Sequence, residues 1–358
     1  CVRACREVQH NDVIGMGYRG HGARPVFDFD IGMGQSTCVA CGECVQACPT
    51  GALMEANLLD EKGKRVQFED KSIDTLCPYC GVGCQTRVHV KDNKILYVDG
   101  RDGPANENRL CVKGRFGFDY INHPDRLTKP LIRREGVPKD ANMQLRKEDV
   151  GEVFREASWD EALDFAASGL KRVYETLGGA GIAGFGSAKG SNEEAYLFQK
   201  FIRQGFGTNN VDHCTRLCHA SSVAALMEGV NSGSVTAPFM AAADSDCMIV
   251  IGARPNQNHP VAATYLKDAA ARGAKLIIID PRGHGGGLGR YASHMLQFKP
   301  GTDVALLNAM LNVIITEGMV DIQYVQAHTE GYESLKKRVA DFSPEAMAHL
   351  ESHSWPGN

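Results

Sequence analysis

The stretch "CVACGECVQACP", Cys38 to Pro49, places four cysteines at gaps of two, two and three residues, and a proline follows the last of them. Repeated short gaps let several thiolates converge on one centre, and this spacing is that of a [4Fe-4S] ligand run. Structural zinc sites use two separated cysteine pairs, so zinc explains the spacing less well. The stretch therefore predicts a fold organised around iron–sulfur clusters.

Two further cysteines open the chain, in "CVRAC", with the spacing of the third and fourth cysteines of a second such run. In two-cluster ferredoxins the fourth cysteine of each run binds the other cluster. We therefore expect Cys5 to share a cluster with three cysteines of the quoted stretch. These three are Cys38, Cys41 and Cys44. Cys48 would join Cys1 and two cysteines that this sequence does not contain, so the chain is expected to begin inside the motif.

A third group of cysteines fills "CPYCGVGC", and one more follows in "RLCVKG" after 26 intervening residues. These gaps fit another [4Fe-4S] cluster, and Gly81 and Gly83 let the backbone wrap closely round the sulfurs. Its ligands would be Cys77, Cys80, Cys84 and Cys111. The segment 87–100 alternates apolar and polar residues around Asp92-Asn93 and predicts a hairpin, as does the glycine-rich segment 11–34.

Composition excludes several other classes of protein. Ten of the thirteen cysteines lie between Cys1 and Cys111, and disulfides are disfavoured because cysteines two residues apart rarely bridge each other. A length of 358 residues with 43% hydrophobic content supports two or three domains with buried cores. The net charge of −4 gives no basic field, so nucleic acid is not an expected partner, and runs such as "EDKSID" read as solvated surface.

Membrane insertion is not expected either. No stretch approaches the roughly 20 apolar residues of a membrane helix. The chain begins without an apolar secretory segment or a twin-arginine signal, which favours a cytoplasmic location.

From Ser158 onward the pattern changes to alternating helices and strands. Capping boxes at Ser158/Glu161 and Ser191/Glu194 begin two predicted helices. Between them, "GIAGFGSAKG" predicts a strand and a glycine-rich turn, which can present backbone N–H groups to a phosphate. The strands "CMIVIGA" and "KLIIID" flank a predicted helix, and repeated β-α-β units imply a parallel sheet with ligands at the carboxyl ends of its strands. Asp280 lies at one such end, where a carboxylate can accept hydrogen bonds from a ribose or a guanine.

With these motifs in order, together with "NNVDHCTRLCHASSV" and "IIIDPRG", the chain resembles the molybdenum and tungsten oxidoreductases that bind two molybdopterin guanine dinucleotides (bis-MGD). From about Leu76 onward it is similar to the catalytic subunit of formate dehydrogenases. Its first part is similar to cytosolic NAD-linked formate dehydrogenases and to the large iron–sulfur subunit of respiratory complex I. The resemblance implies an α/β fold. Its domains would be a ferredoxin-like domain at 1–60, a small β-rich [4Fe-4S] domain at 70–130 and a parallel-sheet, Rossmann-like molybdopterin oxidoreductase domain at 131–358.

Cys218 and His219 gain roles from this resemblance. In the family, the position of Cys218 supplies the protein ligand of the metal, and formate dehydrogenases follow it with histidine. A soft thiolate suits a redox metal, and an imidazole can accept the proton released from formate. Without the resemblance, Cys218 would be predicted as a buried small hydrophobic residue. The neighbouring His213 and Cys214 are interpreted as structural.

The resemblance also implies a set of cofactor contacts. Lys113, a surface lysine if judged by position alone, would lie between the third cluster and a pterin, where its charge favours electron passage. The loops "GSAKGSNEE", "GARPNQNHP" and "DPRG" correspond to loops that contact the two dinucleotides. The implied contacts are Lys113, Lys189, Asn256, His259, Asp280 and Arg282. The family's formate-binding arginine and its last, cofactor-closing domain would lie beyond Asn358, so the chain is expected to be a fragment.

The activity implied is oxidation of formate to CO2 at molybdenum or tungsten, with electrons leaving through the [4Fe-4S] clusters. NAD is the expected acceptor, reduced on partner diaphorase subunits that contain flavin and iron–sulfur clusters, because no NAD-binding fingerprint occurs in this sequence. A nitrate reductase of the same family is one alternative, but there the residue after the cysteine ligand is typically not histidine. A non-catalytic electron-transfer subunit, as in complex I, is another, and the Cys218-His219 pair and Lys113 argue against it.

Overall fold

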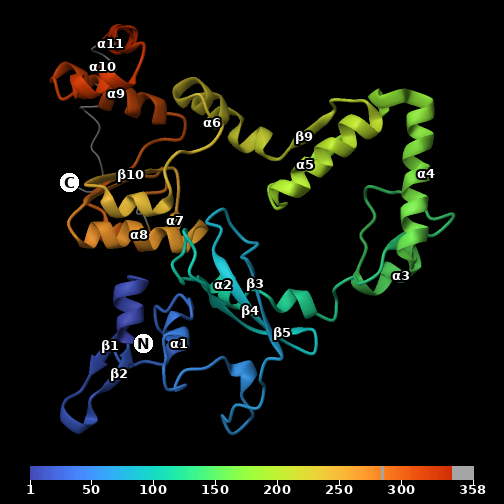
Figure 1. Ribbon diagram of the computed structural model, residues 1–358, viewed down its shortest axis with the longest axis horizontal. Helices are drawn as coiled ribbons and strands as arrows, with labels where there is room; N and C mark the ends of the chain where they lie inside the picture. Colours follow the sequence, from blue (N-terminus) through green and yellow to red (C-terminus); the bar gives the residue numbers. More distant parts are fainter. Residues whose placement is uncertain (284–285, 341–358) are drawn as a thin grey trace. The chain divides into compact units, whose positions relative to one another are not determined.

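The computed structural model describes residues 1–283 and 286–340, and the chain divides into two compact units (Figure 1). Unit 1 is formed by Cys1–Phe116 together with Pro238–Asn358, and unit 2 is formed by Gly117–Ala237. Within the described residues, a hairpin and two three-stranded sheets belong to unit 1, and two pairs of strands belong to unit 2.

Unit 1 contains the elements at both ends of the chain. Its strands are β1 (Ile14–Gly17), β2 (Arg24–Phe27), β3 (Lys71–Leu76), β4 (Gln85–Lys91), β5 (Lys94–Gly100), β10 (Cys247–Ile251), β11 (Lys275–Ile279) and β12 (His294–Leu296). Its α-helices are α1 (Glu43–Gln46), α2 (Val112–Phe116), α7 (Pro255–Asn258), α8 (Pro260–Ala271), α9 (Asp303–Thr316), α10 (Ile322–His328) and α11 (Tyr332–Ala340).

Unit 2 contains the elements between them. Its strands are β6 (Leu131–Arg133), β7 (Phe154–Glu156), β8 (Gly184–Gly186) and β9 (Val211–His213). Its α-helices are α3 (Val150–Val153), α4 (Trp159–Leu177), α5 (Asn192–Lys200) and α6 (Thr215–Val230).

The first two strands form the hairpin that was predicted within 11–34. β1 and β2 are antiparallel, with Ile14 opposite Phe27. Val13 and Ile14 are buried in one hydrophobic cluster with Cys5 and Cys44. The hairpin therefore shields part of the cysteine-rich region from solvent.

The hairpin predicted at 87–100 is also confirmed, as β4 and β5. Asp92 and Asn93 both have positive φ, at 47° and 59°, which is the backbone of the tight turn that joins antiparallel strands most readily. A third strand, β3, pairs with β4 and contains the last four residues of the charged run "EDKSID". All of its residues are exposed, so the prediction of solvated surface holds although the segment is an edge strand.

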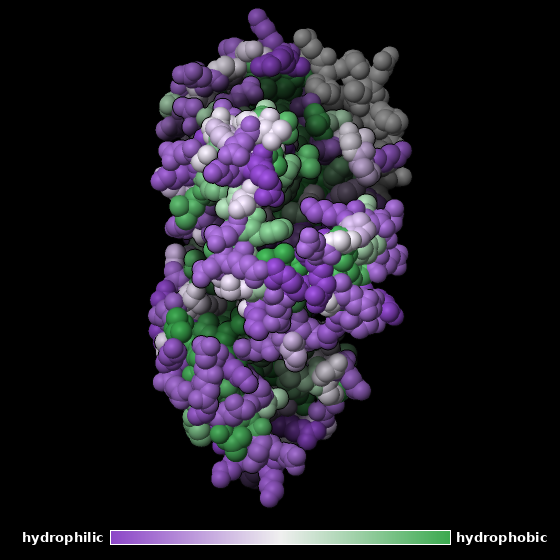
Figure 2. Space-filling view, turned by 90° about the vertical axis from the view of Figure 1, so that its right-hand side faces the viewer, coloured by the Kyte–Doolittle hydropathy of each residue, from purple (hydrophilic) through white to green (hydrophobic). Residues whose placement is uncertain are grey.

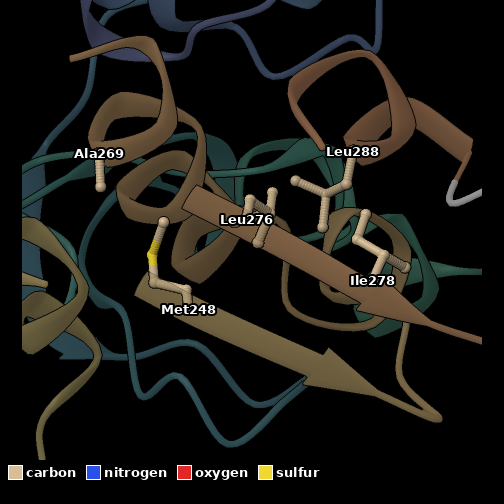
Figure 3. Close-up of a cluster of buried hydrophobic side chains, with 6 residues drawn as sticks. Met248, Ala269, Leu276, Ile278 and Leu288 are labelled. Carbon is tan, nitrogen blue, oxygen red and sulfur yellow. The ribbon is translucent and has the colours of Figure 1, made fainter. Parts of the chain in front are cut away.

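The second sheet of unit 1 is parallel, in the order β10-β11-β12. Its strands are rich in isoleucine and valine, residues that suit strands covered by helices. Met248 of β10 and Leu276 and Ile278 of β11 share a core with Leu288, as Figure 3 shows. The predicted parallel sheet is confirmed. The loop between β10 and α7 and the loop that follows β11 both leave the parallel sheet at its carboxyl edge.

In unit 2, β8 and β9 are parallel and lie beside each other at Gly186 and His213. Helix α5 begins with the predicted capping box. The Ser191 hydroxyl accepts from the Glu194 N–H at 3.2 Å, and the Glu194 carboxylate accepts from the Ser191 N–H at 2.6 Å. The glycine-rich turn therefore leads directly into a well-capped helix.

In the capping box predicted for α4, the second half is the weaker one. The Ser158 hydroxyl accepts from the Glu161 N–H at 3.1 Å. The Glu161 carboxylate forms a salt bridge with Arg155, and the hydrogen bond that it accepts from the Ser158 N–H is only a minor cause of its lowered pKa. A nearby guanidinium is a stronger partner than a neutral amide, which explains the difference.

Helix α4 also exposes large apolar side chains. Trp159, Leu163 and Phe165 are 67%, 60% and 62% exposed. Hydrophobic side chains also lie between hydrophilic ones on the face that Figure 2 shows. No helix within the described ranges is both long and apolar enough to cross a membrane.

Candidate functional site

Four cysteine side chains of unit 1 line one small cavity, which we call the Cys41 site. They are Cys5, Cys38, Cys41 and Cys44. This is the set that the exchange of fourth cysteines between two ferredoxin runs predicts for one cluster. Two of the sulfurs accept backbone hydrogen bonds, from the Val13 N–H to Cys5 Sγ at 3.3 Å and from the Ala40 N–H to Cys38 Sγ at 3.4 Å.

The surroundings of these thiols oppose ionisation. Burial raises the pKa of Cys41 to about 12, with smaller upward contributions from Glu43 and the other thiols. Burial also raises the pKa of Cys44, and Cys38 and Cys5 raise it further. Thiolates gather in such a place only when a positive charge compensates them, and the irons of a bound cluster supply that charge. The donor set therefore fits a [4Fe-4S] cluster.

A second group of thiols lies at the ends of three elements, and we call it the Cys111 site. Its members are Cys77, Cys80, Cys84 and Cys111. Cys77 follows β3, Cys84 precedes β4 and Cys111 precedes α2. The Cys77 N–H donates to the Cys84 carbonyl at 2.9 Å and closes the loop. Burial raises the pKa of Cys84 to about 12, and the other three thiols raise it further, so the four lie close together.

Cys1 and Cys48, predicted for a further cluster, are not among the residues that line the Cys41 site. Cys1 is exposed and Cys48 is half-buried. The pKa of Cys48 falls to about 7, chiefly because the backbone at Leu53 and then the Thr50 hydroxyl hydrogen-bond to its sulfur. Within the described ranges, no three Cys, His, Asp or Glu side chains converge to hold a single metal ion.

A cavity of about 540 Å³ in unit 1 borders both cysteine sites, because Cys41 and Cys111 both line it. Lys113 and Asn256, two of the predicted cofactor contacts, line the same cavity. The Asn256 side-chain oxygen is buried there without a hydrogen-bond partner in the described structure. Such an orphaned acceptor costs about 1–3 kcal/mol. The amide and ammonium side chains in its wall fit a polar ligand.

Two cations of this cavity were not predicted from the sequence, Lys267 and Arg290. The Lys267 ammonium donates to Asn11 Oδ1 at 2.8 Å, and burial lowers its pKa to about 8. Arg290 donates to the Asn11 carbonyl at 2.7 Å. No motif marks either residue, because their shared partner lies more than 250 positions away in the sequence.

Three more predicted contacts lie at or near the carboxyl edge of the parallel sheet. Asp280 is 1% exposed and bonds to Arg282 and Arg254. Burial opposes its ionisation, but hydrogen bonds from Arg282 and the charge of Arg254 outweigh this and lower its pKa. Burial lowers the pKa of His259, and the charge of Lys113 lowers it further, so these two side chains share one region of unit 1.

Cys218 and His219 lie in the first turn of α6 in unit 2, and both are exposed. The Cys218 sulfur lies 2.6 Å from His219 Nδ1. Judged without the family resemblance, Cys218 was predicted to be a buried hydrophobic residue, and this exposure contradicts that prediction. Its partner in sequence, Cys214, accepts a hydrogen bond from the Ala188 N–H at 3.2 Å and so ties α6 to the loop after β8.

The loop after β8 borders a second cavity, of about 580 Å³, within unit 2. Gly186, Ser187, Gly190 and His213 line it. Lys189, predicted to contact the cofactor, is an exposed residue of the same loop. Lys189, Cys218 and His219 thus belong to unit 2, whereas the other predicted contacts belong to unit 1.

Two cysteine sites beside a cavity lined by cations, and a parallel sheet with charged loops at its carboxyl edge, fit an iron–sulfur protein with a nucleotide-type cofactor. The chain belongs to the molybdopterin oxidoreductases, whose family model matches residues 126–334. Residues 70–123 match the Fe4S4 domain of that family, and residues 1–52 match a 4Fe-4S dicluster domain. Its cofactors are [4Fe-4S] clusters and a molybdopterin that carries molybdenum or tungsten.

Relatives and a solved structure agree with this assignment. A protein of Staphylococcus haemolyticus, provisionally named a formate dehydrogenase, is 33% identical over 96% of this chain and 37% of its own length. The F420-dependent formate dehydrogenase subunit alpha of Methanocaldococcus jannaschii is 37% identical over 79% of this chain and 39% of its length. Acetylene hydratase of Pelobacter acetylenicus superposes with a TM-score of 0.63 at 26% identity, over 77% of this chain and 36% of that one. The chain therefore spans less than two fifths of these proteins.

Proposed function

We propose that this chain forms the iron–sulfur and metal-ligand part of a formate dehydrogenase catalytic subunit. The reaction is HCOO⁻ → CO2 + H⁺ + 2 e⁻. The observation that carries the proposal is the Cys218-His219 pair at the start of α6, with sulfur and imidazole nitrogen 2.6 Å apart and both side chains exposed. The names of the relatives support the same activity.

The bound cofactor, bis-MGD with molybdenum or tungsten, supplies the acceptor for two electrons. Cys218 would be the protein ligand of its metal, because a thiolate suits a soft redox metal. His219 would take up the proton, since an imidazole nitrogen can accept a proton and this ring lies against the ligand. The remaining contacts proposed for the cofactor are Lys189 and a further set of five residues. This set is Lys113, Asn256, His259, Asp280 and Arg282.

The electrons would then leave singly through the Cys111 site and the Cys41 site. One observation supports a path from the Cys111 site to the Cys41 site. Cys41, Cys111 and Lys113 all line the same cavity. Cys1 and Cys48 would serve one further cluster. NAD, reduced on flavin- and iron–sulfur-containing partner subunits in the cytoplasm, is the proposed acceptor, and F420 is the acceptor that the name of one relative indicates.

The test compares Cys218→Ala with Cys214→Ala in the full-length protein, purified anaerobically. Both cysteines are exposed and lie four positions apart on the same segment, so Cys214→Ala controls for the loss of a thiol. We expect both variants to keep their iron, and only Cys218→Ala to lose formate-dependent dye reduction. Molybdenum or tungsten content, with NAD and F420 as acceptors, completes the measurement.

Three results would count against the proposal. Full formate oxidation by Cys218→Ala would remove Cys218 from the metal. Iron without molybdenum or tungsten in the wild type would favour a non-catalytic electron-transfer subunit like that of complex I. Nitrate-dependent dye oxidation without formate oxidation would favour a nitrate reductase.

A further inference from the structure

Arg115 is hydrogen-bonded to a ligand residue of each cysteine site. Its backbone N–H donates to the carbonyl of Cys111 at 3.0 Å. Its side-chain Nε donates to the carbonyl of Cys41 at 3.1 Å. The side chain is completely buried, so water does not compete for these bonds. One residue thus connects the main chains of both sites.

The guanidinium of Arg115 is also the cation for two carboxylates. Nη1 lies 3.2 Å from Asp99 Oδ1, and Nη2 lies 3.6 Å from Glu43 Oε2. Nη1 donates further to the carbonyl of Val98 at 3.2 Å. The planar fork of an arginine can serve these separate acceptors at once, which the single ammonium of a lysine cannot.

The network continues from Glu43 back to the Cys111 site. The Gln9 side-chain amide donates to Glu43 Oε2 at 3.2 Å and to the carbonyl of Leu110 at 3.1 Å. Leu110 directly precedes Cys111, and Gln9 is 4% exposed. Both ends of this buried network therefore lie next to residues of the two cysteine sites.

We propose that Arg115 is a positioning residue shared by the two iron–sulfur sites. It fixes the main chains of the two sites relative to each other and keeps a positive charge beside the Cys41 site. This inference rests on the ligand sets of the proposed function. A buried positive charge lowers the free energy of adding an electron to a nearby cluster, so it raises the reduction potential. Without Arg115, the buried carboxylate of Glu43 would lose the guanidinium that faces it, and the half-buried carboxylate of Asp99 would lose one of its partners, which would lower the potential further.

The experiment is an anaerobic, EPR-monitored redox titration of the full-length protein. The signal of the Cys41 site is assigned by its loss in Cys44→Ala. Arg115→Met keeps most of the side-chain volume and removes the charge, and Arg115→Lys keeps the charge and removes the fork. The matched control is Arg87→Met. Arg87 also pairs with a carboxylate, Asp74, on the sheet that carries Asp99, but its side chain is 48% exposed.

We expect Arg115→Met to lower the reduction equilibrium constant of the Cys41 cluster at least tenfold, which is about 59 mV for a one-electron couple. Arg115→Lys should lower it less, and Arg87→Met should leave it within threefold of the wild type. An Arg115→Met protein with full iron content and an unchanged potential would overturn the inference and leave the proposed function untouched.

A second variant is needed if the Arg115→Met protein does not retain the cluster. Asp99→Asn then decides, because it leaves Arg115 less neutralised and should raise the reduction equilibrium constant by threefold or more. An unchanged or lower constant in Asp99→Asn would overturn the inference. If Cys44→Ala removes no EPR signal that the wild-type protein shows, both the ligand set and the role of Arg115 are overturned.

Discussion

Replacing Gly42 by alanine tests how tightly the Cys41 site is built. Gly42 precedes α1 with φ +71°, in the left-handed region. A Cβ at this position would lie 2.7 Å from both Cδ and Nε of Arg115. The Arg115 side chain is fully buried and bonded to the Cys41 carbonyl, so it cannot swing aside without breaking that bond.

The magnitude has two parts. A non-glycine residue in the left-handed region costs about 1–2 kcal/mol. Forcing a methyl group into a packed interior costs about 1–3 kcal/mol more. Gly63→Ala is the matched control, because Gly63 has φ +73° but nothing within 4 Å of its added Cβ. Gly42→Ala should therefore be about 1–3 kcal/mol less stable than Gly63→Ala.

The assay is anaerobic urea unfolding of both variants, with iron content measured before the titration. We expect Gly42→Ala to unfold at lower urea than Gly63→Ala, and to lose the iron of one cluster. Equal unfolding midpoints and equal iron in the two variants would refute the packing argument, because the two substitutions share the same backbone strain.

Three further outcomes are expected. After iron is removed by chelation, iodoacetamide at pH 7.5 should label Cys48 at least tenfold faster than Cys41. The pKa of Cys48 is about 7, whereas burial raises the pKa of Cys41 to about 12. Equal labelling rates, measured by peptide mass spectrometry, would contradict these environments. Burial lowers the pKa of His10, so the unfolded chain takes up a proton first as pH falls below about 6.5. The loss of thermal stability between pH 7 and 5.5 should therefore be smaller in His10→Gln, and an identical loss would contradict it. Leu276→Ala, at a fully buried position, should cost about 2–5 kcal/mol in urea unfolding, whereas Leu163→Ala, 60% exposed, should cost well under that.

Much of the architecture could be predicted because its determinants are local. A turn such as Asp92-Asn93 depends on residues that are neighbours in sequence, and alternating or helical periodicity depends on a window of about ten residues. The grouping of Cys5 with cysteines more than thirty positions away was also predictable, because the spacing of an iron–sulfur run carries its long-range partner implicitly.

Other features depended on contacts that no local pattern contains. Glu161 takes Arg155 of the preceding strand as its main partner, which the capping-box pattern does not include. Lys267 and Asn11 pair across most of the chain, and their meeting depends on how α8 packs against the start of the chain. Cys218 was expected either at a metal or in a core, and only the fold could show that its helix leaves it exposed.

The sequence by itself predicted the grouping of Cys5 with Cys38, Cys41 and Cys44, the two hairpins, the parallel sheet and the family, because each follows from spacing or periodicity within short segments. Only the tertiary structure decided that the Arg115 side chain reaches the Cys41 carbonyl and that Lys113 and Asn256 line a cavity beside both cysteine sites. These depend on which segments pack together, and that choice is made by the burial and hydrogen bonding of the whole chain.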